Sequence, residues 1–420
     1  MASPAPAPAP APQSPGLPWR MASTMVMGIT GIISRSILYG LNSVEVTGLQ
    51  RLLDVLDSRK DIEKRQRGLL TVSNHVSVVD DPLIWGLLPL SYAFNPSNLR
   101  WTLGAHDICF ANKVFANFFT YGQVLPAHRL KHSPHGGLFQ PCLTQAIRLL
   151  SSQPYSSNRL PSSPQRDHDS SQVPDPFTVG AMTFSTTGTD TIPAPSVFQR
   201  NRHSWVHVFP EGLVHQHPTC DLRYFKWGVA RLILESEPAP DILPMFIDGT
   251  QNLMPEDRGF PRFLPRMGKR IRVAFGEVLD YEETFGDLRR RWQALVHKAA
   301  TSATQNQPSQ KQQTIASRLS ALVPLWSSSP PPTPTTTKKT MVVVGELRDY
   351  RELMYSAEAN AIRIEVARRM REQVLKVRKS MVGYPESDPK LGDASTWAAD
   401  ESNSEKKYRS RVDGSGIEQD

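Results

Sequence analysis

A histidine and an aspartate stand five positions apart after a short apolar run, within the stretch Thr71–Pro82. The imidazole of His75 is a useful proton acceptor near neutral pH when a carboxylate fixes the tautomer of its ring. Both Asp80 and Asp81 are close enough in sequence to supply that carboxylate. The spacing predicts a general-base dyad, although such pairs also occur as capping or turn residues.

The neighbouring residues predict the scaffold of this dyad. Leu69–Val72 is an apolar run typical of a buried strand. Leu83–Leu88 follows Pro82 and is typical of an apolar helix that begins after an N-cap and a proline in its first turn. His75 would therefore lie on a strand-to-helix loop, where a rigid scaffold commonly holds catalytic groups.

A second predicted strand, Trp205–Phe209, also runs into a turn. Pro210 and Gly212 are the residues that impose this turn. Glu211 lies between them and has two interpretations. Its carboxylate either bonds nearby backbone or points at a hydroxyl or head group of a ligand.

These segments resemble motifs of the glycerophospholipid acyltransferase superfamily. His75 and Asp80 match its His-x4-Asp motif, and 209–212 match its Phe-Pro-Glu-Gly motif. The stretch 122–129 is similar to the intermediate block that ends in a substrate-binding arginine, and 242–245 is similar to a fourth block. Four blocks in the expected order are more specific than any one of them.

The resemblance implies roles for individual residues. His75 and Asp80 would be catalytic, with no cofactor and no metal, and Arg129 would bind a lipid phosphate. The acyl group would pass directly between two lipid alcohols, because no Gly-x-Ser-x-Gly elbow is present to supply a serine nucleophile. The other implied substrate-binding residues are Asn74, Phe209, Pro210, Glu211 and Gly212.

Three further stretches resemble the mitochondrial branch of the superfamily, which transfers acyl chains from phospholipids to lysophospholipids without acyl-CoA. They are 73–86, 223–233 and 260–263. This branch implies phosphatidylcholine as donor and monolysocardiolipin as acceptor, in the remodelling of cardiolipin. It also implies that the protein is attached to the inner or outer mitochondrial membrane and faces the intermembrane space. Assembly with other inner-membrane proteins is possible in this location.

Two alternatives stay open. An acyl-CoA-dependent lysophospholipid acyltransferase of the same superfamily would share every motif. A non-catalytic membrane-surface protein would keep the His-Asp loop for structure alone.

The order of apolar runs predicts the fold class. Strand-like runs alternate with helical ones, which favours an α/β fold with a central mixed β-sheet flanked by helices, and the resemblance implies the same architecture. The strand-like runs are 69–72, 205–209, 242–248 and 271–275, and the helical runs are 83–88, 143–150 and 225–235.

Composition divides the chain into a core and low-complexity segments. We predict an acyltransferase core over 47–300 and a C-terminal amphipathic helix over 341–382 that belongs to it. Segments poor in large apolar residues cannot offset their ordering entropy and are predicted to be disordered. These are 1–18, an insertion at 151–200, 301–340 and the tail 383–420, and deletion of 155–197 should be tolerated.

The segment 19–46 is predicted to be a helix in the membrane interface. Its uninterrupted apolar run falls short of the roughly twenty residues that span a bilayer, and Arg35 would be costly near the bilayer centre. We therefore predict monotopic attachment, with a marginal or re-entrant insertion as the alternative. The basic part of the C-terminal helix, 368–379, either meets anionic lipid or forms a solvated face of a helix packed on the core.

Charge indicates the kind of partner that the chain binds, and cysteine content indicates whether disulfides or a zinc site are expected. Lys and Arg number 48 against 40 Asp and Glu, and this net charge of +8 favours anionic partners. No nucleic-acid motif accompanies it, so lipid is the better prediction. The three cysteines show no Cys-x-x-Cys spacing, which argues against a disulfide framework and a thiolate zinc site. Histidines at helical spacing, 128–135 and 203–207, have no matching carboxylate cluster in sequence.

Overall fold

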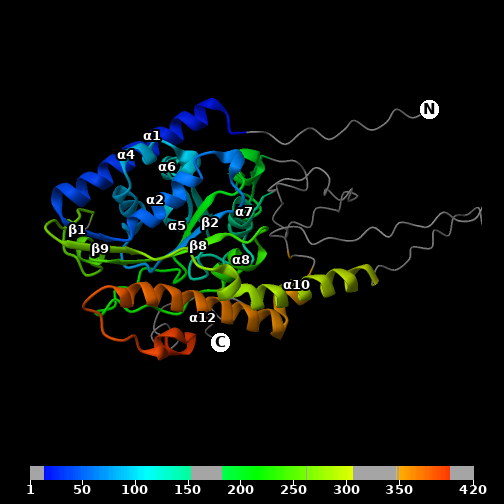
Figure 1. Cartoon of the computed structure of the whole chain (residues 1–420). Helices are drawn as coiled ribbons and strands as arrows, with labels where there is room; N and C mark the ends of the chain where they lie inside the picture. Colours follow the sequence, from blue (N-terminus) through cyan, green and yellow to red (C-terminus); the bar gives the residue numbers. More distant parts are fainter. Residues whose placement is uncertain (1–13, 153–181, 262, 306–346, 348–349, 398–420) are drawn as a thin grey trace, which may run out of the picture.

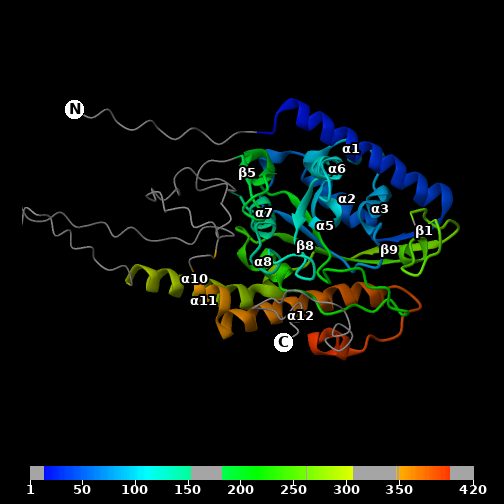
Figure 2. The same cartoon turned by 180° about the vertical axis from the view of Figure 1, so that it is seen from behind.

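The computed structural model describes residues 14–152, 182–261, 263–305, 347 and 350–397. A seven-stranded mixed sheet lies between two layers of helices (Figures 1 and 2). Helix α1 (Leu17–Arg35) runs along one side of the sheet, and α10 (Tyr281–Gln305) and α12 (Ala357–Ser380) run along the other. The predicted α/β class with a central mixed sheet is confirmed.

The direction of the strands determines where the loops meet. Five neighbouring strands run parallel, β9 is antiparallel to β8, and β1 is parallel to β9. The carboxyl ends of the five parallel strands therefore lie at one edge of the sheet, where ligands bind in open α/β sheets. The order across the sheet is β1 (Ser43–Thr47), β9 (Arg270–Phe275), β8 (Asp241–Asp248), β2 (Leu69–Val72), β7 (Trp205–Val208), β3 (Arg100–Ala105) and β4 (Val124–Ala127).

The pairing register of β2 determines where the loops with the His-x4-Asp and Phe-Pro-Glu-Gly motifs begin. Leu69 lies opposite Trp205 on one side and Asp241 on the other, and Val72 lies opposite Val208. Because β2 and β7 end level with each other, the loops that follow them start side by side.

Residues of the sheet alternate between two apolar cores. Leu70 and Val72 pack on the side of α7 (Pro141–Leu150), α8 (Gly228–Glu235) and α12, whereas Leu69 packs on the side of α2 (Leu49–Ser58). This alternation is the two-residue period of a strand that is covered on both faces.

The predicted strands are observed within one residue, but the predicted helices differ more. The run 143–150 lies within α7, and the run 225–235 is helical only from Gly228. The run 83–88 forms α3 (Asp80–Leu83) and then the 3-10 turn η3 (Ile84–Leu87). The other elements are short: α4 (Leu90–Ala93), α5 (His106–Cys109), α6 (Lys113–Tyr121), α9 (Thr250–Leu253), η2 (Ile62–Lys64) and η4 (Pro96–Asn98).

The N-terminal segment differs from the single interfacial helix predicted for 19–46. Helix α1 continues into a π-helix, η1 (Ser36–Gly40), and the chain then enters β1. The 24 residues of Leu17–Gly40 are long and apolar enough to cross a membrane by length and composition, so the expectation of a segment too short to span was wrong. Helical structure extends through Arg35, whose Nη1 donates to the carbonyls of Gly86 and Leu88, each at 3.2 Å.

Part of the segment predicted to be disordered over 151–200 is structured. Residues 182–201 form a hairpin, β5 (Thr183–Phe184) and β6 (Ile192–Pro193), and two turns, η6 (Pro195–Val197) and η7 (Gln199–Asn201). Phe184 and Val197 are buried, and the hydroxyl of Ser196 donates to Oε1 of Gln145 in α7 at 2.6 Å. Deleting 155–197 would remove these contacts. Residues 153–181 lie outside the described part of the chain.

The C-terminal segment also departs from its predicted pattern. The single helix predicted for 341–382 contains two helices, because Ser356 ends α11 (Arg351–Tyr355) and caps α12 by accepting a hydrogen bond from the N–H of Ala359. The buried face of α12 passes through Ile362, Val366 and Met370. Residues 383–397 of the predicted disordered tail are structured and include η10 (Pro389–Gly392). The other predicted low-complexity stretches, 1–13, 306–340 and 398–420, lie outside the described residues.

Candidate active site

The structure brings His75 and Asp80 together at the carboxyl edge of β2. Nδ1 of His75 lies 2.9 Å from Oδ2 of Asp80. The same oxygen accepts hydrogen bonds from the backbone N–H groups of Val76 and Ser77, both at 2.8 Å, and Oδ1 accepts one from the hydroxyl of Thr250 at 2.5 Å. This fully buried carboxylate is therefore fixed in place before any substrate binds.

Asp81 has a different set of partners, which settles the alternative left by the sequence. Its Oδ1 accepts from Nε of Arg100 at 2.7 Å, and the indole of Trp85 also donates to it. Burial acts to raise the pKa of Asp81, but the adjacent guanidinium outweighs burial and lowers that pKa below its ordinary value. Asp81 is thus a structural ion-pair residue, and Asp80 is the partner of the histidine.

The ring of His75 is also held from the side. It stacks on Phe209 with the ring centroids 4.3 Å apart and the planes 24° apart. With Nδ1 directed at Asp80, the second ring nitrogen Nε2 has no hydrogen-bond partner among the described residues. Since 21% of the side chain is exposed, Nε2 is the atom available to take a proton from a ligand.

Glu211 bonds backbone, as the first of its two interpretations predicted, but this backbone belongs to two other loops and not to its own turn. Its Oε1 accepts from the N–H of His75 at 2.9 Å and its Oε2 from the N–H of Arg223 at 3.0 Å. The side chain is 2% exposed, and burial raises its pKa to about 7. Glu211 therefore positions the histidine loop instead of facing a ligand.

The turn around Glu211 needs glycine. Gly212 has φ +67°, in the left-handed region, and a Cβ there would lie 2.9 Å from the side chain of Lys226. Its N–H donates to the carbonyl of Phe209 at 3.0 Å, and the carbonyl of Pro210 accepts from the N–H of Lys226 at 2.8 Å. These bonds fix the direction in which the chain leaves β7.

Asn74 does not face a ligand, in contrast to the sequence prediction. Its Nδ2 donates to the carbonyl of Ile247 and its Oδ1 accepts from the N–H of the same residue, each at 2.8 Å. Because β8 uses both ends of the amide, Asn74 extends the pairing between β2 and β8 beyond the last strand residue.

Arg129 follows β4 at the same edge of the sheet. It forms an ion pair with Asp107 of α5, and both side chains are about one-third exposed. Strands β7 and β3 lie between β2 and β4, so the histidine and arginine loops start about 14 Å apart at the usual strand spacing.

Helix α12 also supports the site, which the sequence did not indicate. Arg371 is buried, and its guanidinium donates to the carbonyls of Leu222 at 2.7 Å and Arg223 at 2.9 Å. The N–H of Arg223 in turn bonds Glu211, which holds His75. The only signal in sequence was the basic run of the helix, which does not show which arginines turn inward.

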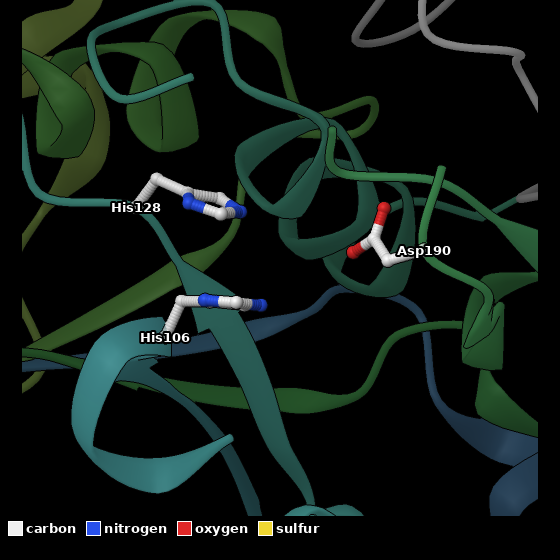
Figure 3. A group of neighbouring side chains, drawn as sticks. All are labelled: His106, His128 and Asp190. Atoms are coloured by element: carbon white, nitrogen blue, oxygen red, sulfur yellow. The ribbon is translucent and has the colours of Figure 1, made fainter. Parts of the chain in front are cut away.

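A second group of titratable side chains, His106, His128 and Asp190, lies near β3 and β4 (Figure 3). Their possible ligand atoms are within 4.8 Å of one another, and the two imidazoles stack with centroids 4.2 Å apart. The hydroxyl of Thr186 donates to Asp190 and lies 2.7 Å from Nε2 of His128. The carboxylate also accepts from two amides and two further hydroxyls of its own turn. Hydrogen bonds therefore explain Asp190 and His128, and ring stacking explains His106. The group ties the 182–201 segment to the sheet.

Comparison with known proteins identifies the family. No protein-family model matches the chain. Tafazzin of Saccharomyces cerevisiae is 32% identical to it over 386 residues, which cover 90% of this chain and 83% of the yeast protein. The chain belongs to the tafazzin family.

Other relatives agree. Tafazzin of Drosophila melanogaster is 31% identical over 66% of this chain and 57% of the fly protein. N-acylphosphatidylethanolamine synthase of Arabidopsis thaliana is 27% identical over 62% of this chain and 71% of its own length. The chain is therefore an acyltransferase.

Proposed function

We propose that this tafazzin-family protein is a CoA-independent transacylase that moves acyl chains from phospholipids such as phosphatidylcholine to monolysocardiolipin. The observation that carries the proposal is the fixed dyad of His75 and Asp80, with Nε2 of the histidine open to a ligand. Membership of the tafazzin family, and the plant relative whose name describes acylation of a phospholipid, support a phospholipid as substrate.

In this mechanism His75 is a general base and then a general acid. Nε2 takes the proton of the lysophospholipid hydroxyl as that oxygen attacks the ester carbonyl of the donor. When the tetrahedral intermediate collapses, the imidazolium returns the proton to the departing lysophospholipid oxygen. The carboxylate of Asp80 holds the neutral ring in the required tautomer and stabilises the imidazolium.

The surrounding residues would orient the substrates. Phe209 supports the face of the imidazole, while Pro210, Glu211 and Gly212 shape the loop beside it. Arg129 would exchange its ion pair with Asp107 for a lipid phosphate, which its planar fork suits. At about 14 Å from the histidine loop, such a phosphate would lie well away from the reacting ester.

Helix α1 supports attachment to one face of a membrane. It lies along the core against α3, η3, α4 and α6 instead of projecting from it. Many of its exposed positions are apolar, namely Leu17, Met21, Met25, Ile29, Ile32 and Ile33, and Arg20 is exposed as well. We propose monotopic attachment to the inner or outer mitochondrial membrane on its intermembrane-space side, with anionic lipid and other inner-membrane proteins as neighbours.

The plant relative defines a second candidate, because its name describes acylation of an amine. The same dyad could take a proton from an amine acceptor as from a hydroxyl. Phosphatidylethanolamine should therefore be tested as an acceptor, beside acyl-CoA as a donor.

One assay tests the proposal. Purified full-length protein is incubated with phosphatidylcholine labelled in its acyl chain and with monolysocardiolipin, with and without CoA or acyl-CoA. Label should reach cardiolipin without either cofactor, and His75→Ala should lower the rate by at least about 100-fold. His297→Ala, on the exposed face of α10, is the matched control and should leave the rate unchanged. An absolute requirement for acyl-CoA would contradict the proposal.

A further inference from the structure

A loop of the chain, residues 254–268, leaves α9 and returns to β9 beside the candidate active site. The N–H of Arg266 donates to the carbonyl of Leu253 at 2.8 Å, which closes the base of the loop. Within it, the guanidinium of Arg266 donates to the carbonyl of Gly259 at 3.0 Å. This is the form of an Ω-loop, which is compact and often functional.

The described surface of this loop is unusually apolar. Phe260 is 92% exposed and Phe263 is 78% exposed, and Leu264 and Met267 are also exposed. Exposed aromatic side chains on a surface loop mark a contact surface when no described part of the fold covers them. Over 254–269 four basic residues stand against two acidic ones, Glu256 and Asp257, and this small basic excess favours a partner with negative charge.

The loop adjoins the end of the N-terminal helical segment. The N–H of Gly268 donates to the carbonyl of Leu41 and the N–H of Lys269 to Oδ1 of Asn42, each at 2.9 Å. Tyr39 and Leu41 are exposed at this junction. The base of the loop is therefore close in space to the end of the N-terminal helical segment, which α1 begins.

The loop also adjoins the catalytic histidine loop. Nε2 of Gln216 donates to the carbonyls of Val76 at 3.0 Å and Met254 at 3.1 Å, and its Oε1 accepts from the N–H of Glu256 at 3.0 Å. Val78, between the histidine and the aspartate of the dyad, is 56% exposed. One glutamine thus connects the histidine loop to the base of the 254–268 loop.

We propose that the 254–268 loop is a second membrane-docking element, which inserts Phe260 and Phe263 into the interface of an anionic phospholipid bilayer. This inference rests on the proposed function, since the bilayer supplies both lipid substrates. Contact through α1 alone would leave the core free to roll about the helix axis. A second contact beside the histidine loop removes that freedom and holds the dyad at the level of the lipid ester groups.

Vesicle binding tests the proposal with the full-length protein. The double variant Phe260→Ser with Phe263→Ser is floated with vesicles of phosphatidylcholine, with and without cardiolipin. We expect the partition coefficient to fall about tenfold for each phenylalanine, because each loses apolar burial in the interface. The matched control is Tyr355→Ser with Ile364→Ser. Both side chains are exposed and belong to α11 and α12, on the side of the sheet opposite α1, so the control should bind as the unmodified protein does.

A depth probe makes the result specific to this loop. A polarity-sensitive dye is attached to Phe263→Cys in a Cys109→Ser background, in which the two remaining cysteines are buried. Bound protein should show a blue-shifted dye that lipid-borne quenchers reach. A dye that stays in water while the protein is bound would overturn the proposal. So would unchanged vesicle binding with loss of a dimer in the double variant, which would assign the loop to a second copy of the chain.

Measurements of acyl transfer distinguish a failure of the docking role from a failure of the proposed function. The double variant should transfer acyl chains between short-chain lipids in free solution at the normal rate, but about tenfold or more slowly on vesicles. Equal slowing on both substrates would assign the phenylalanines to folding or catalysis and overturn the docking role. If the unmodified protein transfers nothing from either lipid form, the proposed function fails, and vesicle binding still decides whether the loop docks.

Discussion

Replacing Asp80 by asparagine separates catalysis from folding, because the structure dictates how the new amide must lie. The N–H groups of Val76 and Ser77 both point at Oδ2 of Asp80. The amide oxygen must occupy this position, since an amide nitrogen there would face two donors. The amide nitrogen then takes the place of Oδ1, where the hydroxyl of Thr250 can turn to accept from it.

The magnitudes follow from this orientation. Asp80→Asn keeps all the hydrogen bonds of the loop and should cost about 1 kcal/mol of stability. Asp80→Ala leaves two amides and a buried hydroxyl without acceptors and should cost roughly 3 to 6 kcal/mol. In the asparagine variant the amide oxygen still accepts from Nδ1–H of His75, so the tautomer is correct and only the negative charge is lost. Acyl transfer should therefore fall about 100- to 1000-fold, less than the ~10⁴-fold loss where an asparagine gives a serine-protease histidine the wrong tautomer.

The assay pairs the initial rate of label transfer from phosphatidylcholine with the thermal unfolding midpoint of the same preparations. Turnover within about fivefold of normal in Asp80→Asn would refute a role for the carboxylate charge in the dyad. Equal destabilisation of the asparagine and alanine variants would show that the hydrogen bonds assigned to Oδ2 do not hold the loop.

Three further predictions concern the supports of the site. Because the pKa of Glu211 is raised to about 7 in the folded protein from 4.5, the native state keeps a proton that the unfolded chain loses, and its stability falls as pH rises through this window. The free energy of unfolding, measured with urea, should fall between about pH 5 and pH 8 by up to about 3 kcal/mol more in the unmodified protein than in Glu211→Gln. Parallel pH profiles of the two proteins would contradict the burial of the carboxyl group. Arg371→Leu should lower turnover about tenfold more than Arg363→Leu at matched loss of stability, since Arg363 is also buried in α12 but bonds carbonyls of α11. Equal effects on turnover would make Arg371 a purely structural residue. Gly86→Ala should lower stability by about 1–3 kcal/mol in thermal unfolding, because its Cβ would lie 2.6 Å from the backbone nitrogen of Arg35 and force α1 to shift, and an unchanged midpoint would show that α1 is not packed there.

The sequence determined those features that depend on neighbours along the chain. The strands 69–72 and 205–208 follow from short apolar runs ended by turn residues, and the turn at Gly212 follows from a backbone conformation that glycine accepts. The spacing of His75 and Asp80 also carried its own information, because five residues can fold back into one tight loop. Four ordered blocks were enough to indicate the superfamily.

Only the tertiary structure decided which polar side chains face a ligand and which hold the scaffold. Glu211 bonds an amide 136 residues away, and Asn74 bonds a strand 173 residues away. The choice of Asp80 over Asp81 needed the position of Arg100 on another strand. Arg371 likewise acts on a loop 148 residues before it, and residues 182–201 fold because α7 offers them a partner. A buried polar group must find a hydrogen-bond partner, but the chain's own pattern does not say where that partner lies, because the packing of distant elements places it.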